Sequence, residues 1–364
     1  MNDHFASAMG RALQQTRAGN PAEATRQIQA ALTGRSENAS PAPAERLDTA
    51  RNPRRPLREV IDSLVKGKSL RGVGNVRRHD PPAVPAGATF ETYRHESAFG
   101  ARDVRVFAPS PRDEPVRGLV LMLHGCTQTA DDFAAGTRMN IVAEEHNLIV
   151  AYPDQTRAAN QMGCWNWFRG ADQRRNGGEA ALLADIASSL ASKHGVQSDR
   201  VFAAGLSAGG AMAAILGDTY PEVFAAVGVH SGLAPGSATD VASAYAAMSG
   251  QGAAPRTKRS VAVRSIVFHG TADTTVATSN GDAVVAAALG GLDFDRVEDA
   301  SVAGAKVVMH RDGAGATLVE HWILPGVGHA WSGGSPDGSY THPSGPDASA
   351  EMVRFFLSVP VQRG

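Results

Sequence analysis

The chain has 364 residues, of which 43% are hydrophobic and 20% charged, a composition typical of a folded protein with a sizeable core. Its formal net charge of −1 gives no overall attraction to nucleic acid or to an anionic membrane surface. No stretch has the length and apolar purity of a membrane span. We therefore expect that the protein neither binds nucleic acid nor spans a membrane.

The N-terminal region has a composition of its own. Through Asp80 it carries fourteen Lys and Arg against eight Asp and Glu. Residues 1–35 predict a helical hairpin, whose second helix begins with Asn20 as N-cap and Pro21 at the first helical position. Residues 36–87 predict a linker with room for one short helix: the stretch to Pro56 is rich in Ser, Pro, Ala and Arg, and the stretch before Gly87 carries Gly and Pro. The function of this segment stays open between a solvated arm and a docking unit.

From residue 88 to residue 360 short apolar runs alternate with helical segments. This alternation predicts an α/β domain whose mostly parallel sheet is covered by helices on both faces. In such sheets the reactive groups gather at the carboxyl ends of the strands. The expected strands are Val104–Pro109, Leu119–Leu123, Leu148–Tyr152, Val201–Ala204, Phe224–Val229 and Ser265–Phe268, and the expected helices include Phe133–His146, Glu179–His194, Ala208–Tyr220 and Ala348–Leu357.

The strongest chemical signal is Gly205-Leu-Ser-Ala-Gly209, which follows an apolar run and opens a helix. A strand, a sharp turn and a helix form the context of the nucleophile elbow of α/β-hydrolases. The alternative, an ordinary strand-to-helix turn, lacks a reason for this glycine spacing. Ser207 is therefore the expected nucleophile.

A serine hydroxyl needs a base, and in this fold the chain order is Ser, acid, His. Asp273 follows a predicted strand and is the expected acid, with Asp282 and Asp295 as alternatives. His329 lies on the glycine-rich loop Gly326–His329 and is the expected base. The competing histidines are His269, His310, His321 and His342, of which His269 is expected to hold a turn by hydrogen bonding.

The oxyanion hole of this fold uses the N–H of the residue after the nucleophile and one N–H from an early strand-to-helix loop. The first donor is Ala208. The loop is His124-Gly-Cys-Thr-Gln128, where we expect Cys126 to supply the second N–H. Two donors aimed at the developing negative charge lower the barrier of acyl transfer.

Five motifs in one order resemble the polyhydroxybutyrate-depolymerase family of esterases, which includes feruloyl and acetyl-xylan esterases. They are His124-Gly-Cys-Thr-Gln, Cys164-Trp-Asn-Trp-Phe, Gly205-Leu-Ser-Ala-Gly-Gly-Ala-Met, His269-Gly-Thr-Ala-Asp and Gly328-His-Ala-Trp-Ser-Gly-Gly. The resemblance spans about Thr89 to Leu357 and implies the same triad and an acyl-enzyme without metal or organic cofactor. Substrate contacts are expected from Gln128, Trp165, Trp167 and Trp331.

The loop after Tyr152 leaves two questions open. Trp165 and Trp167 either form a wall for an acyl or aromatic group of the substrate or a small satellite core under a long loop. Cys126 and Cys164 both fall at the active-site end of the sheet, so a disulfide is possible, and reduced thiols fit equally well.

The expected activity is hydrolysis of short 3-hydroxyalkanoate oligoesters or other small esters, with feruloyl or acetyl-xylan esters as the runner-up. A non-catalytic binding module on a hydrolase scaffold is the rival from another class, and its mark would be a missing triad member. Two departures from extracellular members of the family weigh against an insoluble external polymer: we expect no polymer-binding domain after the catalytic one, and no signal peptide is recognisable. The default compartment is cytoplasmic, with secretion left open because many relatives are extracellular.

Overall fold

A computed structural model describes residues 81–253, 263–290, 294 and 296–358. The predicted hairpin of residues 1–35 and most of the predicted linker lie outside the described residues. Within them, residues 81–87 contain no helix or strand, and the first strand, β1, begins at Thr89.

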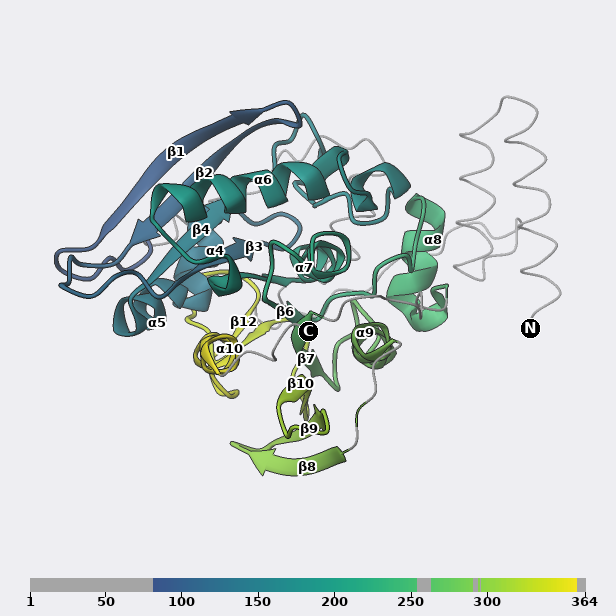
Figure 1. The fold of residues 1–364 in the computed structure, drawn as a ribbon. Helices are drawn as coiled ribbons and strands as arrows, with labels where there is room; N and C mark the ends of the chain where they lie inside the picture. Colours follow the sequence, from purple (N-terminus) through teal and green to yellow (C-terminus); the bar gives the residue numbers. More distant parts are fainter. Residues whose placement is uncertain (1–80, 254–262, 291–293, 295, 359–364) are drawn as a thin grey trace, which may run out of the picture. The chain divides into compact units, whose positions relative to one another are not determined.

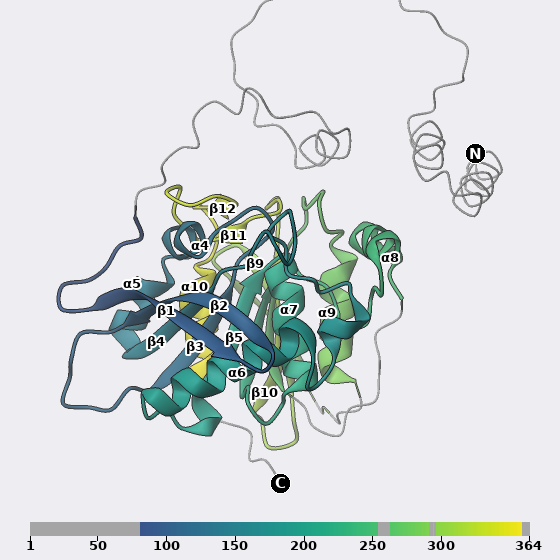
Figure 2. The same ribbon diagram turned by 90° about the horizontal axis from the view of Figure 1, so that it is seen from above.

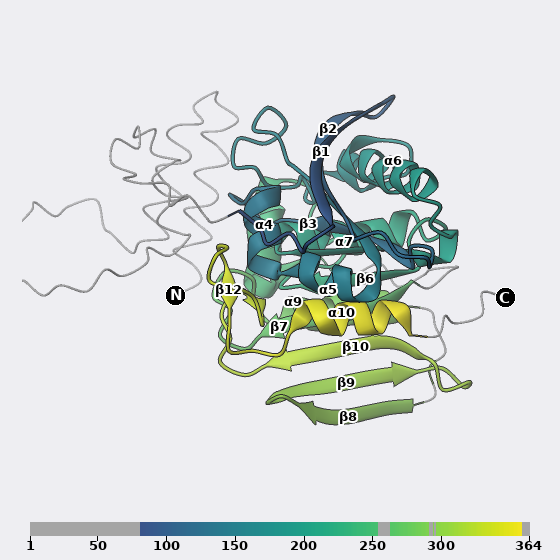
Figure 3. The ribbon, with the colours of Figure 1, turned by 90° about the vertical axis from the view of Figure 1, so that its left-hand side faces the viewer.

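One ten-stranded sheet forms the centre of the domain, in the order β1-β2-β4-β3-β5-β6-β7-β10-β9-β8 (Figure 1). The six strands from β4 to β10 in this order are mutually parallel, and antiparallel strands extend the sheet at both ends. Figure 3 shows β9 and β8, which extend the sheet beyond β10. The strands are β1 Thr89–Ser97, β2 Gly100–Ala108, β3 Gly118–Leu123, β4 Leu148–Pro153, β5 Val201–Leu206, β6 Ala226–His230, β7 Arg264–Gly270, β8 Arg296–Val302, β9 Ala305–Arg311 and β10 Thr317–Leu324.

Helices cover both faces of this sheet (Figures 1 and 2). They are α4 Ala130–Thr137, α5 Met139–His146, α6 Gly178–Lys193, α7 Ala208–Thr219, α8 Val241–Ala246, α9 Ser279–Leu289 and α10 Ala348–Leu357; two short strands, β11 Trp331–Ser332 and β12 Thr341–His342, pair near the end of the chain. The predicted α/β class, with a mostly parallel sheet between helices, is confirmed.

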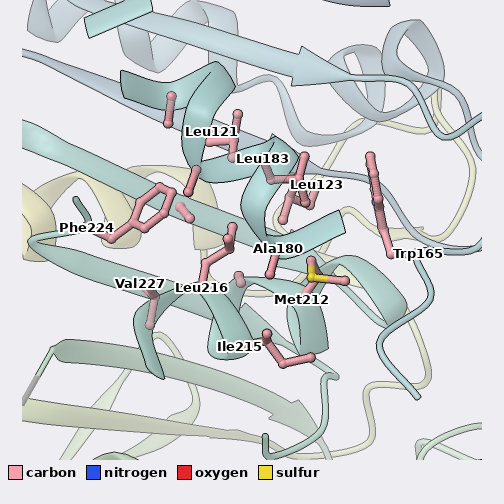
Figure 4. Packing of buried hydrophobic residues seen from close by; sticks show 14 of the residues in the cluster. Leu121, Leu123, Trp165, Ala180, Leu183, Met212, Ile215, Leu216, Phe224 and Val227 are labelled. Atoms are coloured by element: carbon pink, nitrogen blue, oxygen red, sulfur yellow. The ribbon is translucent and has the colours of Figure 1, made fainter. Parts of the chain in front are cut away.

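The side chains of strand β3 show why both faces of the central sheet are apolar. Leu119, Leu121 and Leu123 pack with α6 and α7, whereas Val120 and Met122 pack with α5 and α10 on the other side. Figure 4 shows the first of these cores, in which Leu183 of α6 lies beside Leu123 of β3 and Met212 of α7 belongs to the same cluster. Because alternate residues of a strand point to opposite faces, a strand covered twice must be apolar throughout.

The single helix expected at Phe133–His146 is two helices. Arg138 between them has a left-handed backbone, with φ 55°. The hydroxyl of Ser349, in the first turn of α10, donates to the carbonyl oxygen of Thr137 at 2.7 Å. This long-range contact satisfies the carbonyl at the break, which the local sequence pattern does not reveal.

Candidate active site

Ser207 occupies a strained turn between β5 and α7. Its backbone has φ 58° and ψ −118°, and its N–H donates to the His230 carbonyl oxygen at 2.9 Å. Such a conformation costs a non-glycine residue about 1–3 kcal/mol and clusters at functional sites. Glycine at position 209 is required, because a Cβ there would lie 1.9 Å from the Leu123 carbonyl oxygen. The turn therefore holds the Ser207 side chain at the carboxyl end of the sheet.

Asp273 follows β7 and is hydrogen-bonded through both carboxylate oxygens. Oδ2 accepts from His329 Nδ1 at 2.7 Å, and Oδ1 accepts from the N–H groups of Thr275 and Val276, each at 2.9 Å. Burial by itself would raise the pKa of Asp273, but the hydrogen bond and charge of His329 and the two backbone donors outweigh it, so the pKa is lowered. The carboxylate is thus held ionised against the imidazole.

The loop that carries His329 packs tightly on the end of β7. The N–H of Ala272 donates to the Val327 carbonyl oxygen at 3.0 Å, and a Cβ on Gly270 would lie 2.1 Å from that same oxygen. With Nδ1 bound to Asp273, the proton on Nδ1 is fixed and Nε2 is left for the substrate side.

His230 connects the two parts of the site. Its carbonyl oxygen holds the Ser207 N–H, its ring stacks on Trp331, and its Nε2 accepts from the Ser332 N–H at 3.1 Å. Complete burial, together with the neighbouring histidines His269 and His329, lowers the pKa of His230 to about 3. The nucleophile turn and the His329 loop therefore meet on a neutral ring that does not compete as a base.

The predicted oxyanion loop lies against the nucleophile. A Cβ on Gly125 would be 3.6 Å from Ser207 Cβ. Within the described part of the chain, the backbone N–H groups of Cys126 and Ala208 find no acceptor. Since the first N–H groups of a helix lack an internal partner, Ala208 is a ready donor. Both expected donors are thus free for a carbonyl oxygen bound beside Ser207.

His124 fixes the shape of this loop. Its Nδ1 donates to the Gly125 carbonyl oxygen at 2.8 Å, and its Nε2 accepts from the Gln155 N–H at 3.1 Å. Burial lowers the pKa of His124, so the ring remains neutral with its proton on Nδ1.

The four residues expected to contact the substrate are buried. Trp165, Trp167 and Trp331 are 0%, 5% and 1% exposed and belong to the hydrophobic cores (Figure 4 shows Trp165), the first two to the core that also contains the β3 leucines. Gln128 is buried, and its amide is fully engaged by protein groups. Their burial favours a packing role, and the substrate role of these four side chains stays a prediction, because sequence pattern does not distinguish a buried aromatic ring from one that faces a crevice.

The competing acids and bases lie elsewhere. The Asp282 side chain is 74% exposed and lies 3.8 Å from His321 Nδ1, and Asp295 lies outside the described residues. His269 Nε2 donates to the Val276 carbonyl oxygen at 3.0 Å, the turn-holding contact expected of it. His310 and His321 lie within β9 and β10. Among the described residues no group of three or more His, Cys, Asp or Glu side chains is arranged to hold a metal ion.

Cys126 and Cys164 form a disulfide, with Cα atoms 4.2 Å apart. The Thr127 N–H also donates to the Met162 carbonyl oxygen at 3.0 Å. The oxyanion loop and the loop after β4 are therefore joined by one covalent and one hydrogen bond, directly at the residue whose N–H is the expected second donor.

Reduction of this disulfide is expected to lower both stability and turnover. The bridge joins residues 38 apart in sequence, and releasing it costs about 2–4 kcal/mol of unfolding free energy. Turnover should fall by less than the roughly hundredfold that complete loss of an oxyanion donor costs. Thermal melts and ester assays of Cys164→Ser and of dithiothreitol-treated protein test this, and an unchanged melting temperature in both would contradict it.

We predict that burial of His321 lowers the free energy of unfolding of the protein in acid. Its side chain is 5% exposed, and burial lowers its pKa to about 4, against about 6.5 in an unfolded chain. Below pH 6.5 the unfolded state binds more protons, so His321 removes stability as the pH falls through this window, by about 2 kcal/mol at pH 5. Denaturant unfolding at pH 7 and pH 5 should show a smaller drop for His321→Gln than for the partly exposed control His146→Gln; equal drops would contradict this.

The family model described as Esterase PHB depolymerase matches residues 107–307, a stretch that contains Ser207, Asp273 and the oxyanion loop. The chain belongs to this family. The family relation inferred from the five motifs is thereby confirmed.

The curated relatives of this chain are named either as depolymerases of polyhydroxyalkanoates or as acetylxylan esterases. Poly(3-hydroxyalkanoate) depolymerase C of Paucimonas lemoignei is 31% identical over 250 residues, which cover 64% of this chain and 60% of that protein. Acetylxylan esterase A of Aspergillus awamori is 33% identical over 120 residues, 33% of this chain and 38% of that one. The chain thus spans about three fifths or less of the length of these relatives.

Solved structures agree on the fold. An acetyl xylan esterase from Aspergillus awamori superposes with a TM-score of 0.59 at 20% identity, covering 74% of this chain and 98% of that one. An S-formylglutathione hydrolase from Agrobacterium tumefaciens gives 0.50 at 14% identity, covering 75% and 96%. The predicted α/β-hydrolase fold is confirmed.

In the segments that the structure describes, no helix has the length and apolar character to cross a bilayer.

Proposed function

We propose that this protein is a serine esterase that hydrolyses carboxylic esters through an acyl-enzyme. The observation that carries the proposal is the grouping of a strained Ser207, an Asp273–His329 pair at 2.7 Å and two free backbone N–H groups at one edge of the sheet. All three triad members are present, which argues against a non-catalytic binding module.

The proposed reaction has two halves. His329 Nε2 takes the proton of Ser207 as its Oγ attacks the ester carbonyl carbon, and Asp273 stabilises the imidazolium that forms. The N–H groups of Cys126 and Ala208 donate to the carbonyl oxygen as it gains negative charge. The alcohol leaves with the proton from His329, and water then attacks the acyl-enzyme by the same route to release the acid. No step calls for a metal ion or an organic cofactor.

The proposed substrates are short 3-hydroxyalkanoate oligoesters and other small carboxylic esters. This choice is supported by the relative with the longer match, which is named for poly(3-hydroxyalkanoate). Acetyl-xylan esters are the second candidate, since several curated relatives and a solved structure of similar fold carry that name.

A substrate panel tests the choice. Purified protein is assayed with p-nitrophenyl acyl esters of increasing length, 3-hydroxybutyrate dimers to tetramers, acetylated xylan and methyl ferulate. We expect the hydroxybutyrate oligomers to give the highest kcat/KM among the natural esters. A higher value for acetylated xylan would select the second candidate, and no hydrolysis of any ester would overturn the proposal.

A further inference from the structure

We propose that Gln128, Asp132 and Ser339 act as a positioning clamp, which fixes the oxyanion loop relative to the loop that follows His329. The inference rests on the proposed function and assigns a role to three residues outside the triad. The clamp joins segments more than 200 residues apart in sequence, with Gln128 at one end and Ser339 at the other.

Gln128 holds the oxyanion loop from inside. Its Oε1 accepts from the Gly125 N–H at 2.9 Å, and its own backbone N–H donates to the Gly125 carbonyl oxygen at 3.3 Å. Both polar groups of Gly125 are thus engaged, and the peptide that leads into Cys126 has a single orientation. The next N–H along the chain, that of Cys126, is the one left free for substrate.

The amide nitrogen of Gln128 reaches the other side of the clamp. Nε2 donates to Asp132 Oδ2 at 3.1 Å and to the Ser339 carbonyl oxygen at 3.0 Å. Asp132, in the first turn of α4, also accepts from the Ser339 N–H at 2.9 Å and from the Ser339 hydroxyl. One buried carboxylate therefore binds both loops at once.

The segment around Ser339 is itself tied to His329. The Tyr340 carbonyl oxygen accepts from the Trp331 N–H at 2.7 Å, two residues after the base. Gly338 packs so closely on α4 that a Cβ there would lie 2.3 Å from Gly136 Cα. The loop that follows His329 is thus fastened to the same helix that carries Asp132.

Two residues with left-handed backbone, Thr127 and Tyr340, are in contact next to the clamp residues Gln128 and Ser339. Thr127 has φ 69° and Tyr340 has φ 53°, and the Thr127 hydroxyl hydrogen-bonds the Tyr340 hydroxyl at 3.2 Å. Left-handed backbone is especially unfavourable for a β-branched residue such as Thr127, and it persists only where surrounding contacts determine it. The hydrogen bonds of the clamp and the contact between the two hydroxyl groups hold the backbone of the oxyanion loop in this conformation.

The placement of Asp132 favours positioning over simple stability. A buried carboxylate costs free energy unless donors satisfy it, and here the donors come from the two loops that must be aligned for reaction. An oxyanion donor acts on the transition state more than on the bound substrate. Loosening the clamp should therefore reduce kcat and leave KM almost unchanged.

The test compares Gln128→Met and Asp132→Asn with the control Asp131→Asn. Met keeps the length of Gln128 without its polar groups. Asp131 is the neighbouring acid, exposed and paired with Arg105 at 2.8 Å, outside the clamp. Steady-state kinetics on a soluble p-nitrophenyl ester are normalised to the p-nitrophenol burst, so that only active protein is counted.

We expect kcat to fall about ten- to hundredfold in both clamp variants, with KM within about threefold and Asp131→Asn unchanged. Affinity for a boronic acid, a tetrahedral analogue, should fall in parallel with kcat. Unchanged kcat in both clamp variants, or equal losses in the control, would overturn the clamp. If Ser207→Ala were still active, the proposed function itself would fail, so the two failures are distinguishable.

A milder variant covers the case in which the buried substitutions prevent folding. Tyr340→Phe removes only the exposed hydroxyl contact to Thr127. We expect kcat to fall about threefold to tenfold at unchanged KM, less than the loss of a whole donor. A kcat equal to that of the wild type in this variant would contradict the view that the two loops are held in register for catalysis.

Discussion

Ser207→Ala is expected to remove ester hydrolysis almost completely, by on the order of a millionfold in kcat, because no other group can form the acyl-enzyme. The protein should still fold, since the Ser207 side chain makes no capping hydrogen bond to helix α7 and the methyl group of alanine occupies less space. The measurement is the initial rate with p-nitrophenyl butyrate, with circular dichroism and thermal melting as checks of folding.

The matched control is Ser188→Ala, which removes an exposed serine of α6 whose hydroxyl bonds only the Ala184 carbonyl oxygen. Its activity should equal that of the wild type. Residual activity of Ser207→Ala within about a hundredfold of the wild type would contradict a nucleophilic role for Ser207.

Asp273→Asn is expected to lower kcat by on the order of ten-thousandfold at neutral pH. An asparagine amide cannot stabilise the imidazolium, and its nitrogen would favour the wrong tautomer of His329. The two backbone donors on Oδ1, from Thr275 and Val276, keep the turn in place, so the folded structure should survive. Kinetics from pH 5 to pH 9 measure the effect.

The control for this substitution is Asp282→Asn, at the exposed alternative acid. Its activity should remain within about twofold of the wild type, as for most surface substitutions. Near-normal activity of Asp273→Asn with a large loss in Asp282→Asn would reverse the assignment of the acid.

The parallel core of the fold is predictable from sequence because both faces of its strands are buried. Runs such as Leu119–Leu123 and Val201–Ala204 are apolar throughout, and the strands β3 and β5 that contain them extend those predictions by only one or two residues. Strand β1 was not predicted. Its sequence, Thr-Phe-Glu-Thr-Tyr-Arg-His-Glu-Ser, is mostly polar and charged and has no apolar run, as befits an edge strand with exposed side chains.

The triad segments are predictable because each follows a recognisable strand, and glycines mark the close backbone approaches around them. Gly209 and Gly270 are two such marks, since a side chain at either position would collide with backbone atoms. The clamp was not predictable, because Ser339 meets Asp132 and Gln128 only after the chain has folded. The positive φ of Thr127 leaves no sequence signal, since threonine rarely adopts it.

The buried tryptophans show a second limit of sequence reasoning. A motif such as Cys164-Trp-Asn-Trp-Phe168 marks a special loop, but it does not say which way the rings point. Glu179, buried on α6, accepts hydrogen bonds from the Asn166 N–H at 2.6 Å and from its side chain at 2.8 Å, and this draws the loop inward. That partner lies in another element, so the local pattern left a substrate wall and a core under the loop both open.

Covalent labelling identifies the nucleophile of the protein. The protein is treated with a fluorophosphonate, digested and analysed by tandem mass spectrometry, with and without prior incubation with a hydroxybutyrate trimer. The account predicts a single adduct on Ser207, formed more slowly when the ester is present and absent from Ser207→Ala. An adduct on a different residue, or equal labelling of Ser207→Ala, would contradict it.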